Sequence, residues 1–374
     1  MSSEVEVPWY TEKGHFQDVV ISSRIRLARN LANFPFAMNF RGDDSERVQS
    51  LVFDAFSRIQ SEEENFSFSV VDSKSINDDG RKLFEEWGVL KSSGFSKNPR
   101  RKFPEETGLV FQKKKSLSLS ALVNSGDHVR ISSFCAGLDF QSCFSECAEI
   151  DGKLQKNLQF AATYDFGYLT CALKDAGTGM KISARIHIPG IVRTGKFSLV
   201  TEFLKDKNLN ISPAFPQISN GSAAGSFYLL STKSSMRGSE FDQIAEFESD
   251  CMYIAEIERK ILADYADTKR TVVFNSVIRS YSLAKFSLLE SLSESVEIIS
   301  DLMIGLKCGL ISGIELEKLC ELLFKIQPYH IIFLLKEGNF SFEKDILNDK
   351  KGKIDRLRAL VLHEAVQNIS LGNL

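Results

Sequence analysis

The chain of 374 residues has 43% hydrophobic and 25% charged residues, the composition of a globular protein with material for one large domain or two. Its net charge of −3 excludes a bulk basic field, so no nucleic-acid partner is expected. No uncharged apolar stretch approaches the roughly 18 residues of a membrane span, so no membrane partner is expected. The seven cysteines lack zinc-binding spacing, and their odd number behind a polar amino terminus indicates reduced thiols, a cytoplasmic location and no metal site.

Up to about residue 230, strand-like runs alternate with helical stretches. Helical spacing of apolar residues is seen over 44–64, with Asp44 or Ser45 as the expected N-cap, and a second helix is expected over 144–160. Strands are predicted at 17–30, 116–124, 167–173 and 181–189. The Ser/Lys-rich stretch 91–102 and the lysine run 113–115 are typical of solvated surface.

After residue 238 the strand pattern almost disappears. Residues 239–266 are predicted to form one long amphipathic helix, with an apolar stripe from Phe241 to Ile261. Helical patterns continue to the end of the chain, with breaks expected at Gly305, Gly309, Gly313 and 326–330. The order of elements therefore predicts a domain of strands and helices followed by a helical one.

Cations gather at the predicted strands of the first domain. Arg24 and Arg26 are two residues apart, so their side chains project from one strand face. Arg130 follows a second strand, and Lys181 and Arg185 alternate on a third. Guanidinium groups suit phosphate oxygens, so converging cations would form a polyphosphate clamp, although each one alone is more typical of a solvated strand face.

The chain resembles the phosphagen (ATP:guanidino phosphotransferase) family, most closely its bacterial protein-arginine kinases, in four segments: VVISSRIRLARNLANFPF, VNSGDHVRI, GYLTCALKDAGTGMK and IDRLRALVLHEA. The resemblance implies an α+β fold: a phosphagen-kinase-like antiparallel sheet flanked by helices, followed by an all-helical C-terminal domain. It implies a catalytic domain over 1–262 and a helical domain for dimerisation or phosphoarginine binding over 263–374. The implied partners are protein substrates or phosphoarginine-bearing proteins, a zinc-finger activator, a Clp-type chaperone-protease and a second copy of the chain.

The resemblance also places ATP, with Mg, on the cations of the first domain. The residues expected at the nucleotide are Ser22, Ser23, Arg24, Ile25, Arg26, Arg130, Lys181, Ser183 and Arg185. In phosphoryl transfer such cations position the nucleotide and neutralise the charge of the transferring group. The sequence indicates no protein ligand for the metal.

The loop at 124–128 departs from the family pattern Asn-Glu-Glu-Asp-His. Asn124, Asp127 and His128 match, while Ser125 and Gly126 stand where the family has its two glutamates. A carboxylate there orients the substrate guanidinium and helps its proton leave, and an arginine that stays cationic is a poor nucleophile. No catalytic residue is therefore assigned, although Asp127 and His128 flank the two positions and Asp127 could rotate toward them.

Other family positions differ as well. Lys181 replaces an arginine, Ala172 stands at a cysteine position beside Cys171, and loop 216–226 lacks the family's Glu and Arg, with Ala223 at the acidic position. In the C-terminal domain, the bacterial phosphoarginine-binding motif Arg-Asp-x-x-Arg-Ala keeps Asp355 and Arg358 but has Ile354 in place of its first arginine. The alternative for Asp355 and Arg358 is a plain surface ion pair.

Three functions remain open at this point. The first is a protein-arginine kinase, transferring phosphoryl groups from ATP to arginine side chains of proteins, with impaired activity. The second is a pseudokinase that binds nucleotide or phosphoarginine as a regulatory partner in protein quality control. The third, a kinase for small guanidino compounds, is disfavoured because the C-terminal domain is of the bacterial type.

Overall fold

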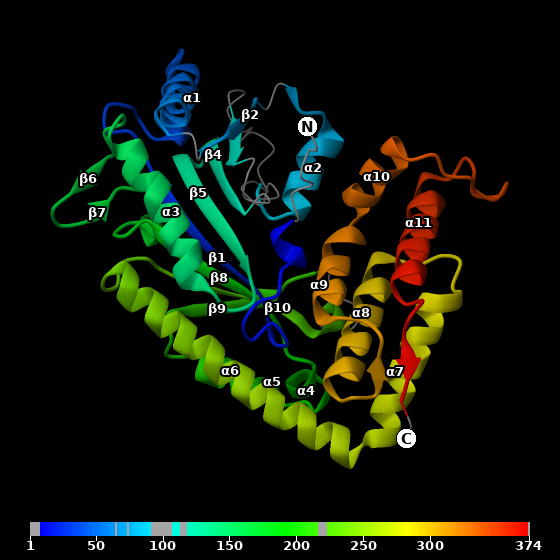
Figure 1. Cartoon of the computed structure of the whole chain (residues 1–374). Helices are drawn as coiled ribbons and strands as arrows, with labels where there is room; N and C mark the ends of the chain where they lie inside the picture. The colour runs from blue at the N-terminus through cyan, green and yellow to red at the C-terminus, as the bar shows by residue number, and fades with distance from the viewer. Residues whose placement is uncertain are drawn as a thin grey trace. The chain divides into compact units, whose positions relative to one another are not determined.

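The computed structural model describes residues 8–63, 66–72, 75–90, 107–112, 118–215 and 223–372 (Figure 1). The predictions for 91–102, for 113–115 and for most of loop 216–226 lie outside these residues. The chain divides into two compact units. Unit 1 comprises Met1–Glu12, Ser23–Ser183 and Ser231–Ser249, and unit 2 comprises Lys13–Ser22, Ala184–Leu230 and Asp250–Leu374.

The described residues form an eight-stranded sheet in the order β2-β3-β4-β5-β1-β8-β10-β9, and the pairs from β2 to β5 are antiparallel. With helices flanking this sheet, the α+β fold class predicted from the sequence is confirmed. Its strands are β1 (Val20–Arg29), β2 (Phe68–Asp72), β3 (Gly108–Gln112), β4 (Leu119–Ser125), β5 (Asp127–Ala136), β8 (Met180–His187), β9 (Leu209–Pro213) and β10 (Phe227–Thr232). Two short pairs complete the strands: β6 (Ala162–Thr163) with β7 (Gly167–Tyr168), and β11 (Ile311–Ser312) with β12 (Ser370–Leu371).

Helix α3 (Phe140–Gln155) covers one face of the unit 1 strands and lies along β5 (Figure 1). Its thiols contact the backbone of β1, since Cys143 Sγ lies 3.7 Å from the Ser23 carbonyl and Cys147 Sγ lies 3.7 Å from the Ile25 carbonyl. Asp139 caps the helix by accepting from the Ser142 N–H at 3.0 Å. The other helices of unit 1 are α1 (Asp44–Glu62) and α2 (Asp78–Glu86), with short 3₁₀ turns η1 (Trp9–Thr11), η2 (Ala37–Asn39) and η4 (Leu173–Asp175).

Unit 2 is mainly helical. Helices α7 (Arg270–Phe286), α8 (Leu292–Lys307), α9 (Leu316–Lys325) and α11 (Lys350–Ala365) pack side by side (Figure 1). The remaining elements are α4 (Pro189–Arg193), α5 (Phe197–Phe203), η5 (Ala224–Ser226) and α10 (Pro328–Glu337), and α6 (Glu240–Thr268) begins in unit 1 and ends in unit 2. Among the described residues, no helix is both long enough and apolar enough to cross a membrane.

Several local predictions from the sequence are wrong. The strand expected over 167–173 is only the two residues of β7, because the chain then turns through η4. Gly305 lies inside α8 rather than ending it: a Cβ at this position would lie 2.6 Å from Val277 Cγ1, so glycine lets α7 approach closely. The N-cap of α1 is Asp43, without a side-chain cap, and Phe241 is 63% exposed rather than buried in the stripe of α6.

Candidate functional site

The alternation of β1 separates its side chains into two sets. Arg24 and Arg26 share one face, as the spacing predicts, and Ser23 and Ile25 point to the face covered by α3. Ser23 Oγ donates to the Gly137 carbonyl at 2.7 Å and accepts from the Asp139 N–H at 3.0 Å. The side chains of Ser23 and Ile25 therefore do not lie with the arginines.

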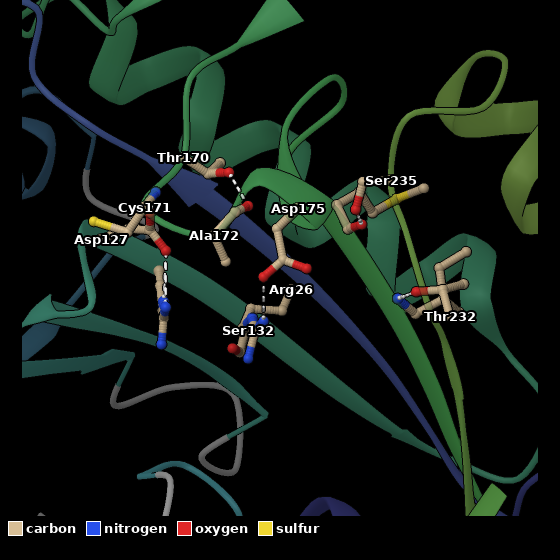
Figure 2. Close-up of polar contacts among 12 residues, drawn as sticks. Arg26, Asp127, Ser132, Thr170, Cys171, Ala172, Asp175, Thr232 and Ser235 are labelled. Atoms are coloured by element: carbon tan, nitrogen blue, oxygen red, sulfur yellow. Dashed lines mark hydrogen bonds and ion pairs between the residues drawn. The ribbon is translucent and has the colours of Figure 1, made fainter. Parts of the chain in front are cut away.

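Arg24 and Arg26 each make a polar contact with a neighbouring side chain. Arg24 Nη2 donates to Ser132 Oγ at 3.2 Å, and its guanidinium lies over the Phe134 ring at 4.6 Å. Arg26 Nη2 lies 3.7 Å from Asp175 Oδ2, and Figure 2 shows Asp175 pointing toward Arg26. The Nε atoms of both arginines are buried and have no hydrogen-bond partner within the described residues.

Arg24, Arg26, Arg130 and Lys181 act on one another electrostatically, and together they are called the cation cluster below. Burial, followed by the charge of Arg26, lowers the pKa of Arg24 to about 9. Burial, followed by the charge of Arg130, lowers the pKa of Arg26 to about 10. Burial and the charge of Arg26 also lower the pKa of Lys181. Four cations lie here against two buried carboxylates, Asp127 and Asp175, and two of the cations carry Nε donors without a partner among the described residues, an arrangement that would suit an anion.

Lys181 is held in place through its neighbours on β8. The Ile182 N–H donates to Thr232 Oγ1 at 3.2 Å, and Ser235 Oγ donates to the Met180 carbonyl (Figure 2). The residues on either side of Lys181 are buried, and alternation leaves Lys181 itself partly exposed.

Asp127 lies at the start of β5, is fully buried, and accepts hydrogen bonds at both of its carboxylate oxygens. Arg130 donates to its Oδ2 from Nε at 2.9 Å, with Nη2 at 2.8 Å. Its Oδ1 accepts from Asn30 Nδ2 at 2.9 Å and from the Cys171 N–H at 2.7 Å (Figure 2). Burial alone would raise the pKa of Asp127, but the charge of Arg130 and these hydrogen bonds outweigh it and lower the pKa. These contacts oppose any rotation of the carboxylate toward positions 125 and 126.

The side chain of His128 is also held in place by hydrogen bonds. Its Nδ1 accepts from the Leu31 N–H at 2.9 Å, so the ring proton is on Nε2, which donates to the Pro35 carbonyl at 2.9 Å. The ring stacks on Phe40 with centroids 5.1 Å apart. Burial lowers the pKa of His128, so the imidazole is neutral and holds the hairpin rather than serving as a free base.

The residue between β4 and β5 must be small. Gly126 has φ +91°, and a Cβ added there would lie 2.4 Å from Arg130 Nη2. A glutamate at this position would therefore collide with the guanidinium that neutralises Asp127. Ser125 precedes it as the last, buried residue of β4.

Cys171 stands beside Ala172, where the family pattern has its cysteine. Its thiol donates to the Gly126 carbonyl at 2.6 Å. Burial, followed by the charge of Asp127, raises the pKa of Cys171 to about 11. The thiol is therefore protonated at neutral pH and cannot act as a thiolate.

The remaining predicted nucleotide residues are dispersed between the units. Ser183 is half-buried on the same face of β8 as Lys181, while Ser22 and Arg185 belong to unit 2. Arg185 lies 5.0 Å from the Phe215 ring centroid and 5.2 Å from that of Phe324, and burial lowers its pKa to about 10.

Sequence reasoning missed three contributors to the site: Asp175, Asn30 and Ser132. Asp175 lies within the quoted GYLTCALKDAGTGMK segment, and Asn30 directly follows the arginine-bearing strand, so proximity to the motifs was their only signal. Among the described residues, no group of three or more His, Cys, Asp or Glu side chains is arranged to hold a metal ion. Ala223, at the expected acidic position of loop 216–226, is buried.

The C-terminal motif is built into the packing of unit 2. Arg358 is 1% exposed and donates to the carbonyls of Ile326 at 2.8 Å and Glu290 at 2.7 Å. It also donates to Asp355 Oδ1 at 2.6 Å. Arg358 is thus buried and Asp355 half-buried in this pair, and their binding of phosphoarginine stays a prediction.

Residues 47–261, more than half of the chain, match the family model of the ATP:guanido phosphotransferase C-terminal catalytic domain. The protein-arginine kinase of Syntrophomonas wolfei is 27% identical over 330 residues, covering 88% of this chain and 89% of that protein. The protein-arginine kinase of Bacillus cereus is 27% identical over 327 residues, covering 87% of this chain and 89% of that protein.

Solved structures agree in fold. Lombricine kinase superposes with a TM-score of 0.56 at 15% identity, covering 69% of this chain and 70% of that one. The duplicated taurocyamine kinase from Schistosoma mansoni, with bound transition state analog components, superposes with a TM-score of 0.51 at 17% identity, covering 88% of this chain and 41% of that one. The sequence match and the shared fold agree: the chain belongs to the ATP:guanido phosphotransferase family.

Proposed function

We propose that the chain binds Mg·ATP at the cation cluster and is a protein-arginine-kinase-like phosphotransferase with impaired transfer to arginine. The observation that carries the nucleotide site is the pair of arginines on β1, the half-buried Arg24 and the buried Arg26, whose buried Nε donors lack partners within the described residues. Family membership and the likeness to protein-arginine kinases support ATP as the anion and arginine side chains of proteins as the acceptor.

The residues of the cation cluster would have different roles in binding the nucleotide, according to their positions. Arg24 and Arg26 on β1, with Lys181 on β8, would hold the phosphate oxygens and orient the terminal phosphoryl group. Arg130 would border the phosphates, with its position fixed and its charge balanced by Asp127. Magnesium would enter with the nucleotide and neutralise phosphate charge.

The impairment follows from the hairpin at 124–128. A substrate guanidinium must lose a proton as it attacks phosphorus, and a positioned acid/base group typically contributes about 100- to 10,000-fold to such a step. Ser125 and Gly126 offer no carboxylate, and both oxygens of Asp127 are engaged. Asp175 is the carboxylate paired with Arg26, at 3.7 Å.

A second candidate is a pseudokinase that binds nucleotide and regulates a partner without transferring phosphate. The neutral His128, the protonated Cys171 and the engaged Asp127 favour it, because none of them is available as an acid/base group. The expected zinc-finger activator and Clp-type chaperone-protease remain proposals for either candidate.

Calorimetric titration with Mg·ATP tests the nucleotide site. Arg26→Ala should weaken binding by about 1.5–3 kcal/mol, roughly ten- to hundredfold, because a charge-assisted contact is lost. Arg41→Ala removes an exposed arginine from the same unit and should leave the affinity unchanged. No heat of binding by the parent protein at millimolar nucleotide would overturn the proposal.

A phosphorylation assay separates the two candidates. The purified chain is incubated with Mg·ATP and an unfolded arginine-rich protein, and phosphoarginine is counted by mass spectrometry. Slow but measurable transfer that Arg26→Ala abolishes supports the impaired kinase. Nucleotide binding without any transfer supports the pseudokinase.

A further inference from the structure

A groove of ≈ 430 Å³ lies in unit 1, beside the segment that carries Asp175. One wall is the β6–β7 hairpin, the other is the chain from Ser235 (labelled in Figure 2) to Glu240, and Gly177 and Thr178 line its base. Gly177 and Asp175 are two residues apart, so their Cα atoms lie within about 7 Å of each other.

The groove is fixed by close backbone contacts. The Tyr168 N–H donates to the Gly177 carbonyl at 2.8 Å, and the Gly177 N–H returns a bond to the Tyr168 carbonyl at 3.2 Å. A Cβ at Gly167 would lie 2.5 Å from the Gly177 oxygen, so only glycine permits this approach. The hairpin is therefore attached to the Gly-Thr-Gly turn as one preformed piece.

The tip of the hairpin presents apolar surface to solvent. Tyr164 is 103% exposed and Phe166 is 54% exposed. Leu173 and Met236, on the neighbouring segments, are 76% and 49% exposed. Aromatic side chains left this open beside a groove are typical of a surface that contacts a partner.

The charge of the groove is acidic. Asp165 and Glu240 line it, and no Lys or Arg is among the described residues that do so. Tyr168 also lines the groove. The guanidinium carbon of Arg29 lies 3.5 Å from the centroid of the Tyr168 ring, in a cation–π contact. Carboxylates beside aromatic faces are the surroundings that a second, incoming guanidinium would meet favourably.

We propose that this groove docks an extended, unfolded protein segment in which arginine is flanked by apolar residues. The proposal rests on the proposed function and deepens it, because it names how the protein substrate is held. Apolar side chains of the segment pack on Tyr164 and Phe166, and its arginine meets Asp165 and Glu240. The next arginine along the segment then lies close to Asp175 and the cation cluster.

Fluorescence anisotropy without nucleotide tests the groove, using a labelled flexible peptide of Leu, Phe, Gly and Ser with two arginines. The same peptide with citrulline in place of arginine serves as the uncharged probe. Tyr164→Ala/Phe166→Ala should weaken binding of the arginine peptide at least about tenfold, since a few aromatic contacts dominate such surfaces. Met38→Ala/Leu51→Ala removes exposed apolar side chains elsewhere in unit 1 and should leave it unchanged.

Charge variants give a second, independent measurement. Asp165→Asn/Glu240→Gln should weaken binding of the arginine peptide and leave the weaker binding of the citrulline peptide unaltered. Equal affinity of parent and both double variants would overturn the proposal, as would binding of the Tyr164/Phe166 tip to phosphatidylcholine vesicles in preference to the peptide. If the chain binds the peptide but no ATP, the docking proposal stands and the proposed nucleotide site is wrong. If it binds ATP but not the peptide, only the docking proposal is wrong.

Discussion

At the scale of single residues, the site contrasts two kinds of buried charge. Asp127 and Arg130 neutralise each other at 2.8 Å, and every oxygen of Asp127 accepts a hydrogen bond. Arg26 is buried and Arg24 is half-buried, and each has a buried Nε without a hydrogen-bond partner among the described residues, which is unfavourable until an anion arrives. The pair of Asp127 and Arg130 stabilises the hairpin, whereas Arg24 and Arg26 are available to bind an anion.

Gly126→Ala should destabilise the fold by about 1–3 kcal/mol, because the new Cβ requires a left-handed backbone and collides with Arg130. Gly42→Ala is the matched control: Gly42 also has positive φ, +54°, but nothing lies within 4 Å of its added Cβ. Urea denaturation gives the loss of unfolding free energy in both variants. The loss in Gly42→Ala reports the backbone strain alone, and the additional loss in Gly126→Ala reports the collision with Arg130. Equal losses in the two variants would show that Arg130 does not enforce glycine at 126.

The sequence predicted that Arg24 and Arg26 share a face, because strand periodicity alone decides it. It could not predict that Asp127 and His128 are fully engaged, since Asn30, Leu31 and Pro35 come from a distant part of the chain. Tertiary hydrogen bonds of this kind leave no periodic pattern.

At the scale of elements, α7, α8 and α11 are joined by buried polar groups as well as by apolar packing. The connection between α7 and α8 carries Glu290, which is 1% exposed. Burial, followed by the charge of Glu294, raises the pKa of Glu290 to about 7, against the opposing charge of Arg358. The helical character of this part of the chain was predictable, but the bounds of the helices and the glycine inside α8 that admits α7 at Val277 were not.

Glu290→Gln should change how stability depends on pH. In the parent, the folded state keeps the Glu290 proton up to about pH 7 while the unfolded state releases it near its usual pKa of about 4.3, so this group costs stability as pH rises between those values. The variant should therefore be more stable than the parent at pH 8, by about 1–3 kcal/mol, and little different at pH 4.5. Thermal melts of both proteins across this pH range measure the difference in stability. An equal difference at every pH would contradict the prediction.

At the scale of the whole molecule, the chain passes between its two units several times. Ala184–Leu230 groups with the C-terminal helices in unit 2, whereas the preceding part of β8 belongs to unit 1. Within unit 2, His187 Nε2 bonds Ser300 Oγ at 2.8 Å, and the Gly225 N–H donates to Glu297 at 2.6 Å. The predicted boundary after residue 262 therefore cuts through contacts of one compact unit.

Residues 1–262 expressed alone should fail to fold as a cooperative domain. Removal of α7–α11 leaves the buried His187 and the half-buried Arg193 without their partners on α8, which costs stability because polar groups lose their hydrogen bonds. Circular dichroism and thermal melting of the fragment, compared with the full chain, check this. A sharp melt near that of the full chain would show that 1–262 is an independent domain.

We also propose that the full chain is a homodimer through residues 270–374. Phe286, Leu288 and Leu289 are 73%, 64% and 50% exposed in one short segment, a contiguous apolar surface that a second copy would cover. Light scattering at micromolar concentration should give twice the mass of 42.0 kDa. Phe286→Ser/Leu288→Ser should yield a monomer, and a monomeric parent would refute the proposal.

The fit of Arg130 over Gly126 also bears on how a carboxylate could be engineered into this hairpin. Because Arg130 Nη2 lies 2.4 Å from where a Cβ of residue 126 would be, a lone Gly126→Glu substitution is a destabilising step. A carboxylate would be introduced with less strain at Ser125, or at 126 only together with a change that moves Arg130. A redesign of the hairpin therefore has to treat residues 126 and 130 as one unit, because the stability of the hairpin opposes an acid at 126 alone.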